Sequence, residues 1–181
     1  MKNKLNQSKL NQSKLKLAIV SAFALGSASL STAGYAATAF GNMIVSADVE
    51  MSCTVNAGAL DFLTYDPTAA GHNDATAVIT STCTHGGSAK ITMGVGASAA
   101  AGSTNAIPLR QMHNSSDASK LPYFLYQNLG RDLVWGNTED TGVGFTAVEG
   151  VNTETLYGRI PAGETATVGS YADSVSVTLT Y

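Results

Sequence analysis

Apolar and polar side chains alternate along one stretch near the start of the chain. From Met43 to Val55 every odd position is apolar, and every even position except Ile44 is polar. This period of two is typical of a β-strand with one buried face. The stretch covers thirteen residues, whereas about five or six are usual for a strand. We therefore expect Met51–Val55 to pair within a domain and Met43–Val49 to extend beyond it.

An unpaired strand with an apolar face is unstable in water. Each exposed valine or methionine forgoes about 1.5–3 kcal/mol of burial, and the free backbone groups invite another chain. Insertion into a groove on a neighbouring molecule would solve this, and repeated head to tail it would build a filament. The alternation alone fits as well, and slightly better, a segment 37–49 that folds back on its own domain as an ordinary first strand.

Shorter alternating runs predict the remaining strands. Gly- and Asn-rich segments such as Thr84–Ser88 and Gly96–Asn105 separate them as loops. About seven short strands in one chain predict an all-β fold, a single β-sandwich of immunoglobulin type. The runs lie at Ile79–Cys83, Ile91–Val95, Tyr123–Tyr126, Val134–Trp135, Leu156–Ile160 and Ser174–Tyr181.

The first 36 residues have the layout of a secretory signal peptide. A basic region is followed by a short apolar run, Leu17–Gly26, and then by small residues. The apolar run is about half the length of a membrane-spanning helix, so we expect no membrane insertion of the mature chain. Cleavage is expected after Ala36, or after Ala39. The basic residues are Lys2, Lys4, Lys9, Lys14 and Lys16.

Removal of this segment changes the charge of the chain. The segment holds five of the ten basic residues and none of the thirteen acidic ones. The mature chain keeps five basic against thirteen acidic residues, a net charge of −8. Nucleic acids and anionic membranes need clustered basic groups, so this charge argues against both as partners, and we expect no nucleic acid among them.

The two cysteines, Cys53 and Cys83, indicate a disulfide, because an even count in an exported chain is typical of one. The loop that they would close contributes about 3–4 kcal/mol to stability by chain entropy. Metal or catalytic chemistry would need a different spacing of cysteine and histidine. His72, His85 and His113 lie far apart in loop-like sequence, and no nucleophile motif occurs. We therefore expect no cofactor, no metal and no enzymatic activity.

Four local matches, in this order along the chain, resemble the spore coat protein U domain family. The best-understood members of that family are pilins of archaic chaperone–usher pili of the Csu type. The matches are the alternating strand that runs into Ser52-Cys53-Thr54-Val55, the segment STCT at 81–84, LPYFLYQNLGRDLVWGN at 121–137, and the ending YGRIPAG at 157–163 with GSYADSVSVTLTY at 169–181. Together they cover nearly the whole mature chain.

This resemblance implies an immunoglobulin-like sandwich of residues 50–181 that lacks its last strand. A donor strand of a neighbouring subunit, residues 37–49, would complete it. The donor side chains would be Met43, Val45, Ala47 and Val49, although Ala47 is smaller than a typical donor residue. The acceptor groove and chaperone contact would involve Val175, Val177, Leu179 and Tyr181, and Cys53 and Cys83 would form the disulfide of the family.

The resemblance also implies a function. The chain would be a structural subunit of an extracellular adhesive fibre that supports adhesion and biofilm formation. Its partners would be copies of itself or related pilins, a periplasmic chaperone and an outer-membrane usher. It would pass through the periplasm and end in a fibre at the cell surface.

Two alternatives remain open from the residues. The first is a monomeric or spore-coat-type secreted structural protein. The second is a secreted carbohydrate-binding module that uses Trp135, Tyr123 and Tyr126, although a place in the sandwich core explains these aromatic residues better.

Overall fold

The computed structural model describes Gly34 and residues 36–181. The chain divides into two units, Met1–Val45 and Ser46–Tyr181. Apart from Gly34 and Ala36, the predicted signal peptide lies outside the described residues. In the described part of the first unit every residue is exposed, and none belongs to a helix or strand. Within the part of the chain that the structure describes, no helix is long and apolar enough to cross a membrane.

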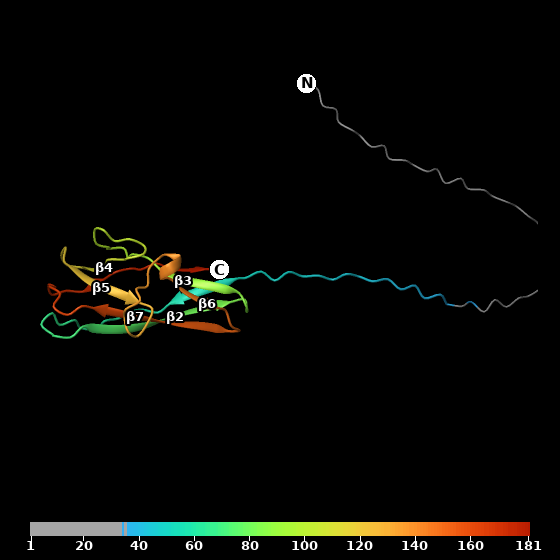
Figure 1. Ribbon diagram of the computed structural model, residues 1–181, viewed down its shortest axis with the longest axis horizontal. Coiled ribbons are helices and arrows are strands. Elements are labelled where there is room, and N and C mark those ends of the chain that lie inside the picture. The colour runs from blue at the N-terminus through green and yellow to red at the C-terminus, as the bar shows by residue number, and fades with distance from the viewer. Residues whose placement is uncertain (1–33, 35) are drawn as a thin grey trace, which may run out of the picture. The chain divides into compact units, whose positions relative to one another are not determined.

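The second unit contains two antiparallel sheets (Figure 1). The larger has six strands in the order β1-β2-β7-β5-β4-β8, and the smaller has three in the order β6-β3-β9. A short 3-10 helix, η1 (Glu139–Thr141), precedes β6. The strands are β1 Cys53–Ala57, β2 Asn73–Cys83, β3 Ser88–Met93, β4 Arg110–Asn114, β5 Lys120–Tyr126, β6 Val143–Thr146, β7 Val151–Ile160, β8 Tyr171–Ala172 and β9 Val177–Thr180.

The core consists of the inward-facing residues of both sheets, since alternate positions of a strand face opposite sides. Ile79 of β2 and Ile91 of β3 are each 1 % exposed, and Trp135 is completely buried. The indole Nε1 of Trp135 donates to the carbonyl of Ile91 at 2.9 Å, so the tryptophan is satisfied within the core. The other buried members are Ala77, Met93, Leu121, Tyr123, Leu125, Leu156 and Ile160. The predicted all-β sandwich is confirmed.

A buried arginine connects the two sheets. Arg110 on β4 is 2 % exposed, and its guanidinium donates to the carbonyls of Gly94, Met93 and Trp135 at 2.8, 2.9 and 2.8 Å. Burial lowers the pKa of Arg110 to about 10, which still leaves it charged at neutral pH. Gly94 in turn donates its N–H to the carbonyl of Ser176 at 2.9 Å. Arg110 thus fixes the end of β3 that holds the segment before β9.

The structure corrects several expected strand boundaries. Strand β1 begins at Cys53 rather than at Met51 and runs on to Ala57 rather than ending at Val55, because its pairing partner β2 ends at Cys83. Val134 makes only an isolated bridge to Tyr126 and starts no strand. Strand β9 is limited to Val177–Thr180, where it pairs with β3. Strands β4, β6 and β8 were not expected from the alternation, and His113 lies in β4 rather than in a loop.

Cys53 and Cys83 form a disulfide. They face each other at the start of β1 and the end of β2. The hydrogen bonding continues one residue further, because Thr84 N–H donates to the carbonyl of Ser52 at 2.9 Å and Ser52 N–H donates to Thr84 Oγ1 at 3.1 Å. Residues 52–53 are therefore held in extended conformation along β2.

Candidate functional site

Two strands at the open side of the sandwich each have one unpaired edge. β1 pairs with β2 alone, and β9 pairs with β3 alone. An edge strand presents a row of free N–H and C=O groups that can pair with another strand. Val55 faces the inner side of β1, yet it is 37 % exposed. The inner side of the sandwich is thus incompletely covered along this edge.

A cavity of about 420 Å³ lies beyond these two strands, between the segment after β1 and the segment before β9. The floor of this cavity is the core itself, with Ile79, Met93, Leu125 and Leu156. Its walls are mainly Ala57–Leu60 on one side and Tyr171–Val177 on the other. The floor side chains are themselves buried, from 1 % exposed at Ile79 and Met93 to 6 % at Leu156, so the opening reaches down to the core without leaving it exposed.

A second cavity of about 560 Å³ adjoins the first. The two share Leu60, Phe62, Met112 and Tyr171 as lining residues. We call the continuous opening the groove, and its two sides the first lip (57–65) and the second lip (166–177). A Cβ on Gly158 would lie 2.6 Å from Leu60 and 2.8 Å from Phe62, so glycine there lets the first lip lie close to the sheet.

Hydrogen bonds hold both lips in place. Asp173 of the second lip accepts from the hydroxyl of Tyr123 at 2.7 Å and from the N–H groups of Ala97 and Ser98 at 2.9 and 3.1 Å. Burial, together with the hydrogen bond to Asp173, raises the pKa of Tyr123, so this phenol keeps its proton. Tyr65 of the first lip donates to the carbonyl of Pro161 at 2.9 Å. The groove is thus built before anything enters it.

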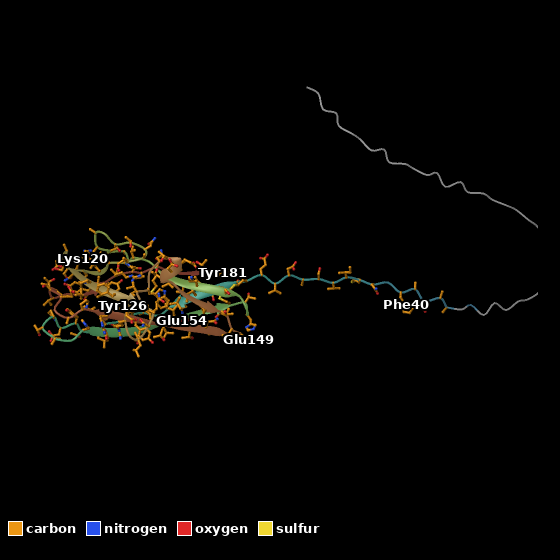
Figure 2. The ribbon with its side chains drawn as sticks, in the orientation of Figure 1. Phe40, Lys120, Tyr126, Glu149, Glu154 and Tyr181 are labelled. Atoms are coloured by element: carbon orange, nitrogen blue, oxygen red, sulfur yellow. A yellow bond between two sulfur atoms is a disulfide. The ribbon has the colours of Figure 1, made fainter. Side chains whose placement is uncertain are left out.

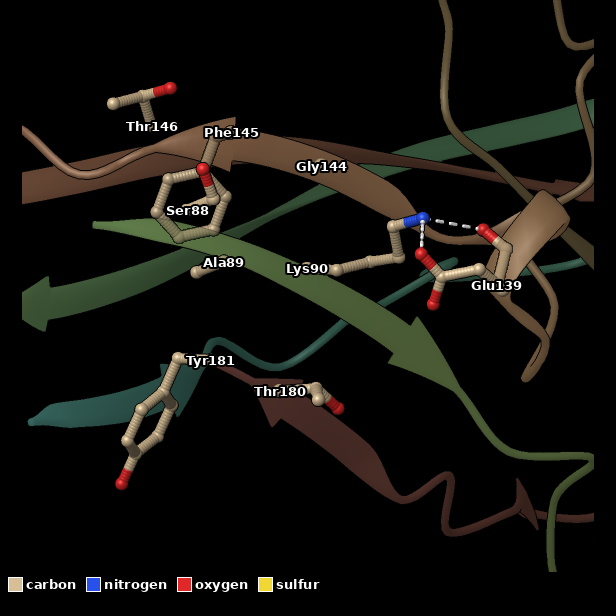
Figure 3. A pocket seen from close by; sticks show the side chains of 9 residues that line it. All are labelled: Ser88, Ala89, Lys90, Glu139, Gly144, Phe145, Thr146, Thr180 and Tyr181. Carbon is tan, nitrogen blue, oxygen red and sulfur yellow. Dashed lines mark hydrogen bonds and ion pairs between the residues drawn. The ribbon is translucent and has the colours of Figure 1, made fainter. Parts of the chain in front are cut away.

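The proposed acceptor residues occupy different places. Val175 and Val177 line the groove, and Leu179 packs partly buried against the core, opposite Ile91. Tyr181 lines a separate hollow of about 690 Å³ beside the ion pair of Lys90 and Glu139. Its ring points away from that ion pair (Figure 3).

The proposed donor residues are all exposed. Met43, Val45 and Val49 are each at least 83 % exposed, and Ala47 is also exposed. Phe40 and Ile44 are exposed to a similar degree, and Figure 2 labels Phe40. None of these residues belongs to a strand. Such a run of large apolar side chains in water is unusual and indicates an interaction segment.

Of the three aromatic residues considered for a carbohydrate-binding module, two are buried and Tyr126 is half-buried. Trp135 is completely buried and Tyr123 is 4 % exposed, so neither can stack on a sugar. The sequence Asn114-Ser115-Ser116 is equally inaccessible to glycosylation, because Asn114 is buried and its side-chain nitrogen lies 3.1 Å from Thr167 Oγ1. Among the described residues, no group of three or more His, Cys, Asp or Glu could hold a metal ion.

The sequence interpretation missed much of the groove. Leu60 and Phe62 alternate directly after β1, and this pattern could have indicated a continuing apolar lip. Met112, Tyr171 and Asp173 gave no such signal. Their place in the groove depends on the pairing of β4 with β8 and on a contact with the Gly96–Ser98 loop.

Comparisons with known proteins give the family. Residues 39–178 match the Spore Coat Protein U domain. The chain is 38 % identical over 157 residues to Protein U of Myxococcus xanthus. This match covers 81 % of the present chain and 87 % of Protein U.

A solved structure of similar fold is the chaperone–tip adhesion subunit pre-assembly complex CsuC–CsuE from archaic chaperone-usher Csu pili of Acinetobacter baumannii. One of its chains matches with a TM-score of 0.53 and 18 % identity, over 74 % of this chain. The present chain spans 40 % of the length of that chain. The fold is of the immunoglobulin-like type found in such subunits. By sequence, the chain belongs to the Spore Coat Protein U domain family.

Proposed function

We propose that the protein is a structural subunit of an extracellular fibre, assembled by donor-strand complementation, and that it has no enzymatic role. The observation that carries this proposal is the groove that lies next to two strands with unpaired edges, together with an exposed alternating segment in the same chain. The segment supplies the apolar side chains that the groove lacks. The strand edges supply the backbone partners that the segment lacks.

The local geometry argues against insertion of the segment into the groove of its own domain. Ser52 is bonded to Thr84 through both its N–H and its carbonyl, and Thr84 Oγ1 lies 3.3 Å from the carbonyl of Glu50. Residues 50–52 therefore continue along β2 and do not form the turn that a hairpin with β1 requires. Insertion parallel to β1 would need a crossover of about a dozen residues or more, and only Glu50–Ser52 separate the donor residues from β1.

The direction of the donor strand in the groove decides whether two subunits form a closed pair or an open filament. β1 starts at the same end of the domain where β9 finishes, because Cys53 pairs with Cys83, β3 begins at Ser88, and Lys90 of β3 pairs with Thr180. A donor antiparallel to β9 would place Val49 at the opposite end of the acceptor. The contact would then be head to tail and would continue as a filament. The reverse direction would bring two like ends together and favour a closed pair.

The proposed partners follow from the same open groove. Before assembly its unpaired strand edges must be covered, and a periplasmic chaperone would do so by lending a strand. An outer-membrane usher would then pass the subunit to the cell surface. The fibre would support adhesion and biofilm formation. The likeness in fold to a subunit solved with its chaperone supports this route.

The test is the size and heat stability of the mature chain with and without residues 37–49. We expect the full chain to form long, heat-resistant polymers and the truncated chain to form none. Monomers of equal stability from both chains would overturn the proposal. They would favour a second candidate, a spore-coat-type structural protein that does not exchange strands. The sequence similarity to Protein U supports this candidate.

The substitution Val45→Asp should abolish polymer formation while leaving the domain folded, because it would place a charge in the apolar groove of the neighbour. The measurement is gel filtration of the mature variant, with circular dichroism to check the fold. Ser46→Asp is the matched control, since position 46 lies on the polar face of the alternating segment and should leave polymerisation intact. Normal polymers from Val45→Asp would refute the donor assignment.

A further inference from the structure

Two exposed apolar side chains stand at the end of the groove that lies away from β9. Leu63 is 86 % exposed, and Val168 is also exposed. Both line the second cavity, one from each lip. We call this pair the exit lip. Exposed aliphatic side chains on both sides of one opening mark a contact surface more often than isolated ones do.

The backbone at Leu63 is itself unusual. Leu63 has a φ of 57°, a left-handed conformation that a leucine adopts only at a cost. Its N–H donates to Asp61 Oδ1 at 2.8 Å, which holds the turn. Asparagine tolerates this conformation better than leucine does. Leucine at this position therefore does not stabilise the isolated domain, because its side chain is exposed to solvent and its backbone is strained.

The length of chain between donor and domain limits where the donating subunit can lie. Val49 is the last proposed donor residue, and Ser52 is already bonded to Thr84 of its own domain. Only Glu50 and Met51 remain between them, and the three residue steps from Val49 to Ser52 span about 10 Å in an extended chain. With Val49 at the far end of the acceptor groove, the donating domain must therefore lie directly against that end.

The two ends of the domain agree with this arrangement. Figure 2 shows Tyr181 and Glu149 toward one end and Lys120 toward the other. At the Lys120 end, Thr167 Oγ1 lies 2.8 Å from Asp117 and 2.8 Å from Ser119, which joins the second lip to the turn between β4 and β5. The donating subunit would present the opposite end, where half-buried Met51 lies close to Gly87.

We propose that the exit lip, Leu63 and Val168, is a second interface between consecutive copies of this chain, and that it receives the Met51 end of the donating domain. This inference rests on the proposed function and adds a domain-to-domain contact to the strand in the groove. The contact would make the joint between subunits stiff. It would also stabilise each joint in addition to the donor strand.

The test compares mature full-length polymers of four kinds: the native chain, Leu63→Asn, and each of these with six Gly/Ser residues inserted after Glu50. The readout is the rate at which subunits leave the polymer at a fixed guanidinium concentration. With the native link, Leu63→Asn should raise that rate about tenfold, as expected for loss of one buried leucine contact. With the insertion, which separates the domains, the substitution should have little effect.

Leu129→Asn is the matched control, since Leu129 is also exposed, at 72 %, but does not line the groove. It should leave the rate unchanged in both backgrounds, and Val168→Asn should act like Leu63→Asn. An equal effect of Leu63→Asn with and without the insertion would mean that Leu63 contacts only the donor strand, and would overturn the inference. No effect in either background would overturn it as well. If the native chain itself forms no polymer, the proposed function fails instead.

Discussion

Replacing Arg110 by alanine should destabilise the domain by about 3–5 kcal/mol, which is the expected cost of leaving buried carbonyls without donors and opening a cavity in the core. The guanidinium supplies three hydrogen bonds to the carbonyls of Met93, Gly94 and Trp135. Its removal would leave these acceptors without partners in the core and would open a cavity beside them. The domain should then unfold at a much lower denaturant concentration, as followed by circular dichroism.

A matched arginine on the outer face of the large sheet serves as the control. Arg159 makes a two-pronged ion pair with Asp74 at 2.7 and 2.8 Å, and its side chain is partly exposed. Because exposed ion pairs contribute at most about 1 kcal/mol, Arg159→Ala should have a small effect. If Arg110→Ala were as mild as Arg159→Ala, the view of Arg110 as the connection between the sheets would be wrong.

Loss of the disulfide should have an effect of nearly the same size. Cys53→Ser together with Cys83→Ser should reduce stability by about 3–4 kcal/mol through chain entropy, which is a large share of the net stability of a domain. The link also joins β1 to β2 at the point where the proposed donor segment leaves the domain. We therefore expect much less folded subunit in the periplasm, measured as soluble protein in a periplasmic extract.

The double substitution avoids a free thiol that could pair wrongly. Thr82→Ser is a suitable control, because Thr82 is exposed on β2 beside Cys83. Native amounts of folded subunit from the double variant would show that the disulfide is dispensable. Loss of subunit from Thr82→Ser as well would point instead to a general sensitivity of β2.

The alternation of residues 43–55 shows how far a sequence pattern reaches. It predicted that a strand runs through Cys53 and that its apolar face needs a cover. It could not show where pairing begins, because alternation reports that one face is buried and not which strand lies beside it. The structure places the start of β1 at Cys53 and leaves Met43, Val45 and Val49 exposed.

The buried aromatic residues and the buried Arg110 differ in how far the sequence predicted their positions. Their place in strand-like sequence favoured the core for Trp135 and Tyr123, and both are buried. Arg110, in contrast, carried no signal in the sequence, because arginine is rarely buried without a carboxylate partner. Only the tertiary structure brings the carbonyls of Met93 and Gly94, at the C-terminal end of β3, and that of Trp135 within reach of its guanidinium.

The sequence by itself determined the fold class, the disulfide between Cys53 and Cys83, and the family of the protein. These depend on local periodicity, on residue type and on short motifs that stand in a fixed order. The tertiary structure alone decided the groove, its lips at Leu60, Phe62 and Asp173, and the exposed pair Leu63 and Val168. The physical reason is that a strand edge is open only because no other strand pairs with it. Such an edge can be recognised only when the pairing of the other strands is known.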